Sequence, residues 1–278
     1  MQLITSESEL VTFAGCAFVP TMGALHAGHR RLIEAAAERS RGRGGPGVVV
    51  SVFVNPTQFN DPRDLERYPR TLEADVEVCR DAGASAVFAP GVEDIYPPKI
   101  ASPPPPLPRV ATEPLLEDAH RPGHFAGVCQ VVKRLFELVR PREALFGEKD
   151  WQQLQVIRAM TLEQGLGVEI VPVATVREAD GLAMSSRNVF LSESDRGAAR
   201  SLSRALCDAC AERIPRRAED RMRAVMSVAG AEVEYAVVRN AATLLPLTPG
   251  EDGEARALVA ARVGAVRLID NAPWPCRA

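Results

Sequence analysis

The four histidines of this chain fall in two short segments that contain glycine. His26 and His29 stand in HAGH, directly after a strand-like apolar run, and His120 and His124 stand in DAHRPGH. Gly23 allows close backbone approach, and a helix that begins near His29 would point its positive end at an anion. Imidazole N–H groups there could donate to phosphoryl oxygens. This segment predicts a phosphate site; a strand–turn–helix with incidental histidines is the alternative.

A second candidate segment, FGEKDWQQLQ, contains one of only three lysines, Lys99, Lys133 and Lys149. In a chain that otherwise uses arginine for positive charge, Lys149 is informative because arginine does not replace its compact ammonium group. It could neutralise phosphate, with Asp150 capping the helix that follows. A capped surface helix is the alternative.

A third segment, ADGLAMSSRN, provides Ser185, Ser186 and Arg187. Two hydroxyls followed by a guanidinium are suited to binding a triphosphate, since arginine makes bidentate contacts with phosphate. A polar linker would have a similar composition.

Two further segments carry polar side chains suited to a small substrate. Asn55 and Gln58 follow a strand-like run, where ligands of open α/β sheets bind, and their amides suit hydroxyls and a carboxylate. Arg121 suits an anion, and His124 could position an incoming amine. A turn and ordinary loop residues are the alternatives.

Hydrophobic patterns predict the elements that must position these side chains. The expected strands are Ala17–Val19, Val48–Val54, Ala86–Phe88 and Glu169–Val173. The expected helices are Arg30–Arg41, Leu72–Ala82, Val128–Val139 and Trp151–Gln164. Alternation of strands and helices predicts an α/β fold with a parallel sheet. A smaller α+β domain should follow, which gives domains at 1–176 and 177–278, while Pro97–Pro108 should be an extended surface loop.

The composition excludes several function classes. A chain of 278 residues with 46% hydrophobic and 25% charged residues is typical of a globular protein. Its net charge of −3 gives no reason to expect nucleic acid as a partner. No apolar run reaches the length of a membrane span, and MQLITSESEL lacks the features of a secretory signal. We therefore expect a cytoplasmic protein with no membrane partner.

The six cysteines do not suggest a disulfide framework in a chain of this size. Cys207 and Cys210 form a C-x-x-C in a segment with helical apolar spacing. A coincidence on a helix face is favoured over a metal or redox site.

Together these segments resemble the pantothenate synthetase (pantoate–β-alanine ligase) family of the HxGH nucleotidyltransferase superfamily. The matches, in order, are VPTMGALHAGH, FVNPTQF, YPRT, RPGHFAGV, FGEKDWQQL, TVREADGLAMSSRN and LIDN. The resemblance implies a Rossmann-like ATP- and pantoate-binding domain followed by a C-terminal domain that closes over the active site. It also implies a homodimer that uses ATP and Mg²⁺.

The implied reaction has two steps. Pantoate attacks the α-phosphorus of ATP to give pantoyl adenylate and pyrophosphate, and β-alanine then displaces AMP to give pantothenate. The first step needs positioning and charge neutralisation rather than a protein nucleophile. The second needs an adenylate shielded from water.

The resemblance also implies roles for the residues of this chain that match the family's motifs. The catalytic set is His26, His29, Lys149 and Arg187, with His29 as the acid-type catalyst. The expected ATP-binding residues are Met22, Gly23, His26, His29, Gly147, Lys149, Asp150, Val176, Met184, Ser185, Ser186 and Arg187. The substrate-binding set is Asn55, Gln58, Tyr68, Arg121, His124 and Gln153. Asp75 matches an acidic position linked to Mg²⁺.

Three features depart from the family pattern. Ala74 stands where relatives often carry a second acidic residue, which weakens the metal assignment. Arg30 and Arg31 follow His29 at positions where other residue types are expected, and the proline-rich stretch 102–108 has no match.

Other functions stay open at this point. A related nucleotidyltransferase would share HxGH and the sheet, but Gln58, Gln153 and the FGEKD segment argue against it. An aminoacyl-tRNA synthetase would pair HxGH with Lys-Met-Ser-Lys-Ser, whereas this chain has Ala-Met-Ser-Ser-Arg at residues 183–187. A non-catalytic four-histidine metal module would bind zinc stoichiometrically. An inactive paralogue would bind without turnover.

Overall fold

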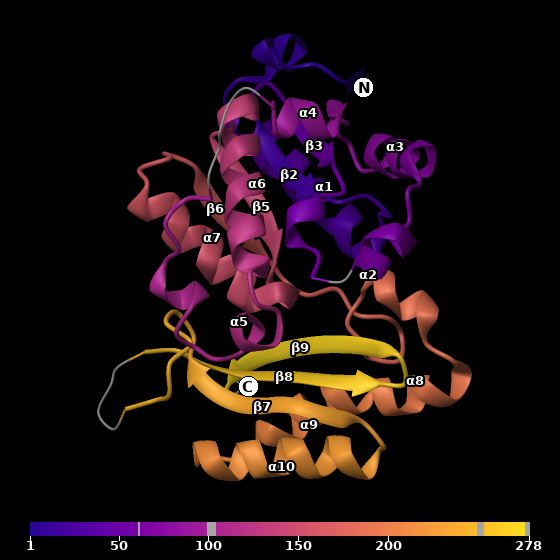
Figure 1. Ribbon diagram of the computed structural model, residues 1–278, viewed down its shortest axis with the longest axis vertical. Helices are drawn as coiled ribbons and strands as arrows, with labels where there is room; N and C mark the ends of the chain where they lie inside the picture. Colours follow the sequence, from indigo (N-terminus) through magenta and orange to yellow (C-terminus); the bar gives the residue numbers. More distant parts are fainter. Residues whose placement is uncertain (61, 99–103, 249–252, 276–278) are drawn as a thin grey trace. The chain divides into compact units, whose positions relative to one another are not determined.

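Six parallel strands form the sheet of the first part of the chain; Figure 1 shows its central strands between helices. The structure, a computed structural model, describes residues 1–60, 62–98, 104–248 and 253–275. The sheet has the order β1-β4-β3-β2-β5-β6, and each neighbouring pair is parallel. The strands are β1 Gln2–Ile4, β2 Ala17–Thr21, β3 Val48–Val52, β4 Ala86–Phe88, β5 Glu143–Gly147 and β6 Glu169–Val173.

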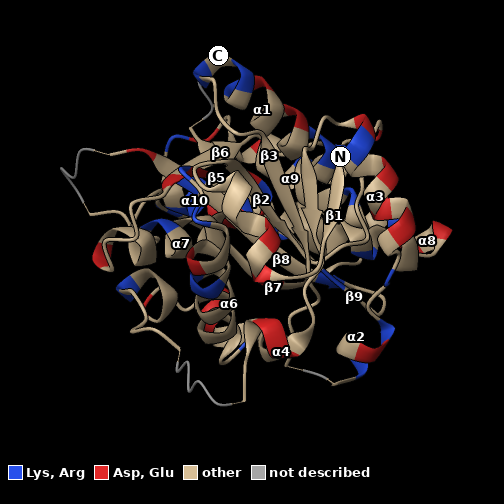
Figure 2. Cartoon of the chain, turned by 90° about the horizontal axis from the view of Figure 1, so that it is seen from above, with Lys and Arg blue, Asp and Glu red and all other residues tan. Residues whose placement is uncertain are grey.

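Helices cover both faces of this sheet (Figures 1 and 2). α1 (Ala27–Arg43) and α3 (Leu72–Asp81) pack on one face, and α6 (His124–Val139) and α7 (Trp151–Glu163) lie on the other. Because both faces are covered, the central strands are apolar throughout, and Val48, Val49 and Val50 are all buried. Shorter helices connect these elements: α2 Pro62–Arg67, α4 Val92–Ile95 and α5 Glu117–His120.

The order of the strands reverses beside β2. From β2 the chain proceeds to β3 and β4 on one side, and β5 and β6 are then added on the other side. Parallel strands present their carboxyl ends at one edge, and ligands of open α/β sheets bind where the strand order reverses. The segments that follow β2, β3 and β5 are therefore the ones positioned to form a site.

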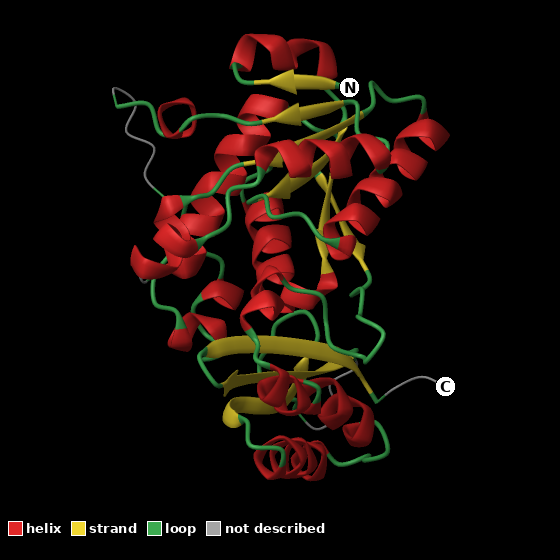
Figure 3. Ribbon diagram, turned by 90° about the vertical axis from the view of Figure 1, so that its right-hand side faces the viewer, coloured by secondary structure: helices red, strands yellow, loops and turns green. Residues whose placement is uncertain are grey.

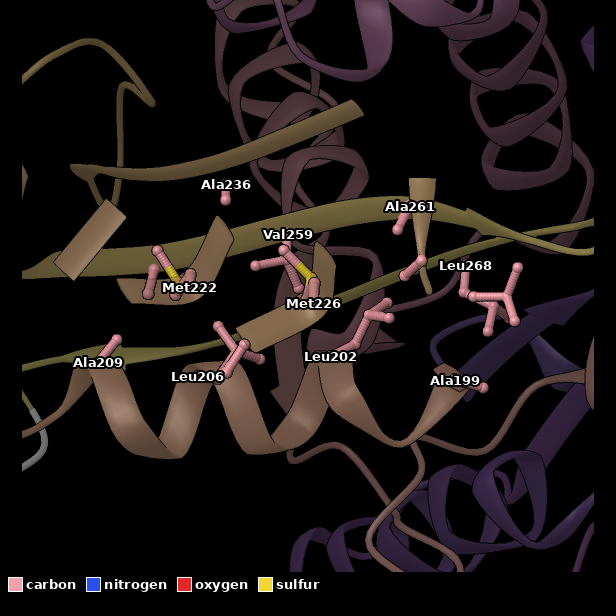
Figure 4. Close-up of a cluster of buried hydrophobic side chains, with 14 of the residues drawn as sticks. Ala199, Leu202, Leu206, Ala209, Met222, Met226, Ala236, Val259, Ala261 and Leu268 are labelled. Atoms are coloured by element: carbon pink, nitrogen blue, oxygen red, sulfur yellow. The ribbon is translucent and has the colours of Figure 1, made fainter. Parts of the chain in front are cut away.

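A second, antiparallel sheet is formed by β7 (Glu232–Asn240), β8 (Ala255–Val263) and β9 (Val266–Trp274). α9 (Ser201–Ala209) and α10 (Pro215–Val228) pack on one of its faces, and α8 (Glu193–Ala199) precedes them (Figure 3). Leu202, Leu206, Met222 and Met226 from the two helices meet Val259 of the sheet in an apolar cluster (Figure 4).

Contacts along the chain define two compact units. The first unit comprises Met1–Glu148 and Gln153–Ala174, and the second comprises Lys149–Gln152 and Thr175–Ala278. The sequence-based division at 176/177 did not anticipate that four residues of FGEKDWQQ belong to the second unit. Lys149 thus shares a unit with Ser185–Arg187.

The expected α/β fold is confirmed, with differences at the ends of elements. All four expected strands and all four expected helices are present, although β3 ends at Val52. The first helix begins earlier than expected, at Ala27, because the His26 side chain caps it. β1 and β5 were missed; β1 has three residues, and β5 starts with the buried charged residue Glu143.

The proline-rich loop and the cysteines can be described in part. Residues 99–103 of the expected surface loop lie outside the described residues, and 104–108 adopt neither helix nor strand. Cys207 is an exposed free thiol, so Cys207 and Cys210 form no disulfide with each other. Within the described ranges, no helix has the length and apolar character needed to cross a membrane.

Replacing Leu206 by alanine should destabilise the second unit by about 2–5 kcal/mol, because a buried leucine leaves a cavity. Leu206 is 2% exposed. Both tryptophans, Trp151 and Trp274, lie in the second unit, so intrinsic fluorescence during urea unfolding reports on it. The matched control is Val228→Ala in α10, at a side chain that is 90% exposed, where the change should stay within about 0.5 kcal/mol. Equal losses for the two variants would contradict this account of the core.

Candidate active site

The two histidines of HAGH cap the first long helix. His26 is the N-cap residue of α1, and its Nδ1 accepts a hydrogen bond from the Gly28 amide at 3.1 Å. Nδ1 of His29 accepts from the His26 amide at 3.3 Å. The two rings lie 4.1 Å apart between centroids, at an interplanar angle of 37°. Histidine thus takes both places in a capping box, which usually pairs Ser or Thr with Glu.

These backbone contacts fix the tautomer of both neutral rings. A backbone amide can only donate, so Nδ1 of His26 and of His29 must be the unprotonated nitrogen. The ring proton then lies on Nε2, which makes Nε2 the donor atom. The sequence predicted donor imidazoles at a helix N-terminus; the structure adds which nitrogen donates.

A buried carboxylate anchors the loop that carries these histidines. Asp75, 2% exposed in α3, accepts the Ala24 amide at 3.1 Å and the Leu25 amide at 2.8 Å. Thr71 Oγ1 lies 3.3 Å from both carboxylate oxygens. Gly23 has a φ of +82°, and a Cβ there would lie 2.9 Å from Asp75 Oδ2. Glycine is therefore needed both for the backbone conformation and for the approach of Asp75.

This geometry bears on the Mg²⁺ role expected for Asp75. Both of its oxygens already accept backbone amides, and among the described residues no three His, Cys, Asp or Glu side chains gather in a possible metal site. Proteins often bind Mg²⁺ through one or two carboxylates together with substrate phosphates. The residues present do not form a ready metal site, and a Mg²⁺ role for Asp75 stays a prediction that this geometry disfavours. The four-histidine metal module gains no support in the described part of the chain.

The turn after β3 is organised around Asn55, which is 1% exposed. Its Nδ2 donates to Gln58 Oε1 at 3.1 Å and to the Gly127 carbonyl at 3.2 Å. Its Oδ1 accepts from Tyr96 Oη at 2.7 Å and from Thr57 Oγ1 at 3.1 Å. These contacts fix the orientation of the Asn55 amide and, through it, the side chain of Gln58.

Two residues of this network were missed by the sequence analysis. Burial raises the pKa of the Tyr96 phenol, so it stays a neutral donor to Asn55. A Cβ at Gly127 would lie 2.4 Å from the Thr57 carbonyl oxygen, so only glycine lets α6 approach this turn. Gly127 stands in HFAG, directly before the helix expected at Val128–Val139, and a glycine that turns out to lie within a helix often has a packing reason.

His124 supports the same turn from α6. It is 4% exposed, and its Nδ1 lies 3.0 Å from the Gln58 carbonyl oxygen, while its Nε2 lies 3.0 Å from a guanidinium nitrogen of Arg121. Since a carbonyl only accepts and a guanidinium only donates, His124 carries its proton on Nδ1. The structure therefore brings Asn55, Gln58, Arg121 and His124 together. It gives His124 a structural contact that sequence reasoning did not predict.

Other predicted site residues of the first unit lie near these turns. The Gln58 Nε2 lies 3.1 Å from the Met22 sulfur, which connects the β3 turn to the histidine loop. The ring of Tyr68 packs edge-to-face on Phe59, with centroids 5.6 Å apart. Gly147 ends β5, and Gln153 lies in the first turn of α7.

The remaining predicted residues belong to the second unit. They are Lys149, Asp150, Val176, Met184, Ser185, Ser186 and Arg187. Val176 and Met184 are paired by a hydrogen bond from the Met184 amide to the Val176 carbonyl at 2.9 Å. The Ser185 Oγ accepts the Arg187 amide at 3.2 Å and begins a short 3-10 helix, Ser186–Phe190. The hydroxyl proton of Ser185 can then serve as a donor.

The loop before Ser185 is braced by polar contacts. The buried Asn188 Nδ2 donates to the Ala183 carbonyl at 3.0 Å and to Glu178 Oε1 at 2.6 Å. A hydrogen bond from Arg196 lowers the pKa of Glu178. The Met-Ser-Ser-Arg stretch is thus a fixed loop rather than a polar linker.

Comparison with known proteins agrees with the resemblance. Residues 3–273 match the family described as pantoate-beta-alanine ligase. A pantothenate synthetase of a Nocardioides species is 53% identical over 270 residues, covering 92% of this chain and 77% of that protein. The crystal structure of pantothenate synthetase from Thermus thermophilus is 44% identical, with a TM-score of 0.89 and coverage of 98% of this chain and 99% of that chain.

A further solved structure adds ligands to the comparison. It is a pantoate-beta-alanine ligase from Francisella tularensis, complexed with beta-gamma ATP and β-alanine. It is 31% identical, with a TM-score of 0.77, and the match covers 98% of this chain and 97% of that chain.

The anchoring role of Asp75 can be tested with Asp75→Asn. An amide offers only one acceptor oxygen, so one of the two loop amides loses its partner, at a cost of about 1.5–3 kcal/mol. Hydrogen exchange at the Ala24 and Leu25 amides should accelerate in metal-free buffer. Asp81→Asn, at the exposed end of the same helix, is the matched control and should leave both amides unchanged. Unchanged exchange in Asp75→Asn would mean that this carboxylate does not hold the loop.

Proposed function

Because the chain belongs to the pantoate–β-alanine ligase family, we propose that it condenses pantoate with β-alanine to pantothenate, through a pantoyl-adenylate intermediate, and releases AMP and pyrophosphate. The observation that carries the proposal is the pair of Nε2 donors, His26 and His29, at the N-terminus of α1. Charge on a phosphoryl group is stabilised by such preorganised donors and by the positive end of a helix.

In the first step the carboxylate of pantoate attacks the α-phosphorus of ATP, and pyrophosphate leaves. His26 and His29 would donate to phosphoryl oxygens, with His29 as the acid-type group. The lysine and guanidinium of the second unit, Lys149 and Arg187, would neutralise the triphosphate together with Ser185 and Ser186. The rate of this step then depends on positioning, because no protein nucleophile takes part.

The pantoate side of the site is supported by the polar network after β3. Gln58 and Gln153 would bind the hydroxyls and carboxylate of pantoate, and Asn55 orients Gln58. Tyr68, Arg121 and His124 would complete the substrate side. In the second step the amine of β-alanine attacks the acyl carbon, and AMP leaves.

Several further features stay predictions. They are the nucleotide contacts of Met22, Gly23, Gly147, Asp150, Val176 and Met184, the entry of Mg²⁺ with the nucleotide, closure of the C-terminal domain, the homodimer and the cytoplasmic location. Mg²⁺ commonly reaches such sites on the phosphates of its nucleotide.

The deciding experiment is ATP–pyrophosphate exchange with Mg²⁺ and pantoate, in the absence of β-alanine. Pantoate-dependent exchange would support the adenylate half-reaction, and addition of β-alanine should then produce AMP and pantothenate. No exchange with pantoate, but exchange with another carboxylate, would instead favour a related nucleotidyltransferase. No exchange with any carboxylate would favour an inactive paralogue.

Lys149→Ala should lower the pantoate-dependent exchange rate by about 10²–10³-fold, as expected for loss of one preorganised transition-state contact. The measurement is the exchange rate at saturating ATP. Lys133→Ala is the matched control, because Lys133 lies on α6 and pairs with Glu137. A rate near that of the wild type in Lys149→Ala would remove this lysine from the mechanism.

His29→Asn separates the two roles of this ring. An asparagine oxygen can take the place of Nδ1 and accept the His26 amide, but it leaves no donor at the position of Nε2. The exchange rate should fall by about 10²–10³-fold while the melting temperature changes little. His120→Asn, at a histidine to which the proposal gives no role, should change neither the exchange rate nor the melting temperature. If His29→Asn kept the wild-type rate, His29 would be only a helix cap.

A further inference from the structure

Adjacent residues of β9 contact two segments that the proposed function assigns to ATP. Asn271 contacts the backbone of Lys149, and Asp270 contacts the side chain of Arg177, which precedes the Met-Ser-Ser-Arg loop. Both β9 residues are 4% exposed. Successive side chains of a strand point to opposite faces. One strand thus holds a different segment on each side, and the sequence analysis gave neither residue a role.

The orientation of the Asn271 amide is fixed by its partners. Nε of Arg256 donates to Asn271 Oδ1 at 2.5 Å, and Asn271 Nδ2 donates to the Lys149 carbonyl at 2.8 Å. A guanidinium cannot accept a hydrogen bond and a carbonyl cannot donate one, so the amide fits in only this orientation. The position requires a donor and an acceptor on one short side chain, which asparagine provides.

Two further contacts hold the same segment through Trp151. The guanidinium carbon of Arg256 lies 3.4 Å from the centroid of the Trp151 ring, in a cation–π contact. The Trp151 Nε1 donates to the Ala241 carbonyl at 2.8 Å. These contacts connect Lys149 and Trp151 to residues of the second unit, to which Lys149–Gln152 belongs.

Asp270 holds the other segment through a bidentate ion pair. Arg177 donates to its two carboxylate oxygens at 2.7 and 3.0 Å. The backbone of Arg177 is in turn bridged to Ala183, just before Met184 and Ser185. Through one strand, the structure therefore connects the Lys149 backbone to the loop of Ser185, Ser186 and Arg187.

We propose that Asn271 is a positioning residue. It holds the backbone of Lys149 in a fixed position relative to the Ser185–Arg187 loop for transfer of the adenylyl group. This inference rests on the proposed function, because Lys149 acts there on the triphosphate. Asn271 itself acts through the carbonyl of Lys149 and contacts no reacting atom. The Asp270–Arg177 pair fixes the other end of the same connection.

The sharpest variant is Asn271→Asp. An ionised carboxylate of the same size still accepts from Arg256 but cannot donate to the Lys149 carbonyl, and it places an acceptor opposite that carbonyl oxygen, so the anchor of the Lys149 backbone is lost. The pantoate-dependent exchange rate should fall by about 10- to 100-fold, as for a small misplacement of a catalytic group. The double variant Asn271→Asp/Lys149→Ala should be no slower than Lys149→Ala, because the two residues act as one.

The controls separate positioning from general stability. Trp274→Phe removes another buried hydrogen bond of the second unit, from Trp274 Nε1 to the Ala209 carbonyl at 3.0 Å, and should keep the wild-type exchange rate. If Asn271→Asp does not fold, judged by tryptophan fluorescence, the same cycle is run with Asn271→Ser, which adds no charge.

The outcomes are distinct. If the rate losses of the two single variants multiply in the double variant, the positioning role is overturned and only a structural one is left. A loss of exchange rate in Trp274→Phe equal to that in Asn271→Asp would have the same meaning. Wild-type exchange in Asn271→Asp would also overturn it. These results would leave the proposed function intact, whereas absence of exchange in the wild-type chain would overturn the proposed function and this inference with it.

Discussion

The buried carboxylate of Asp75 is the contact on which the geometry of the first unit depends. It accepts two backbone amides of the loop between β2 and α1 and so holds the segment that leads to the His26 cap of α1. The two histidines can cap that helix with Nδ1 only because the loop is held in this conformation. Their Nε2 atoms then become donors without any change of tautomer. A residue type that often binds metals thus serves as an anchor for the donor groups.

In the second unit, too, buried polar side chains fix the backbone of segments assigned to the site, but here they lie on a strand and not on a helix. β9 holds the Lys149 segment through Asn271 and the serine loop through Asp270 and Arg177. The polar groups involved are buried and paired, which restricts them to one arrangement. Lys149 and Arg187, which are proposed to bind the triphosphate, carry their charges on long, flexible side chains. Fixing the backbone of each segment limits where those charges can lie.

The chemistry proposed for the site follows from this arrangement of donors. Adenylation needs charge neutralisation and alignment more than it needs a nucleophile, and fixed donors provide both without reorganisation. The amide network around Asn55 suits a small polar substrate, since it offers donors and acceptors in a fixed plane. Membership of the pantoate–β-alanine ligase family and the arrangement of these side chains therefore agree on one class of reaction.

The sequence by itself determined the parts whose signals are local. The α/β fold, the helix after HAGH, the glycine at position 23 and the family could all be inferred from spacing and motif. Only the tertiary structure decided which segments meet: that Asp75 anchors the histidine loop, that Tyr96 orients Asn55, and that Lys149 belongs with β9. The physical reason is that these are contacts between residues far apart in the chain. They depend on strand order and on helix packing, which no local pattern of residues encodes.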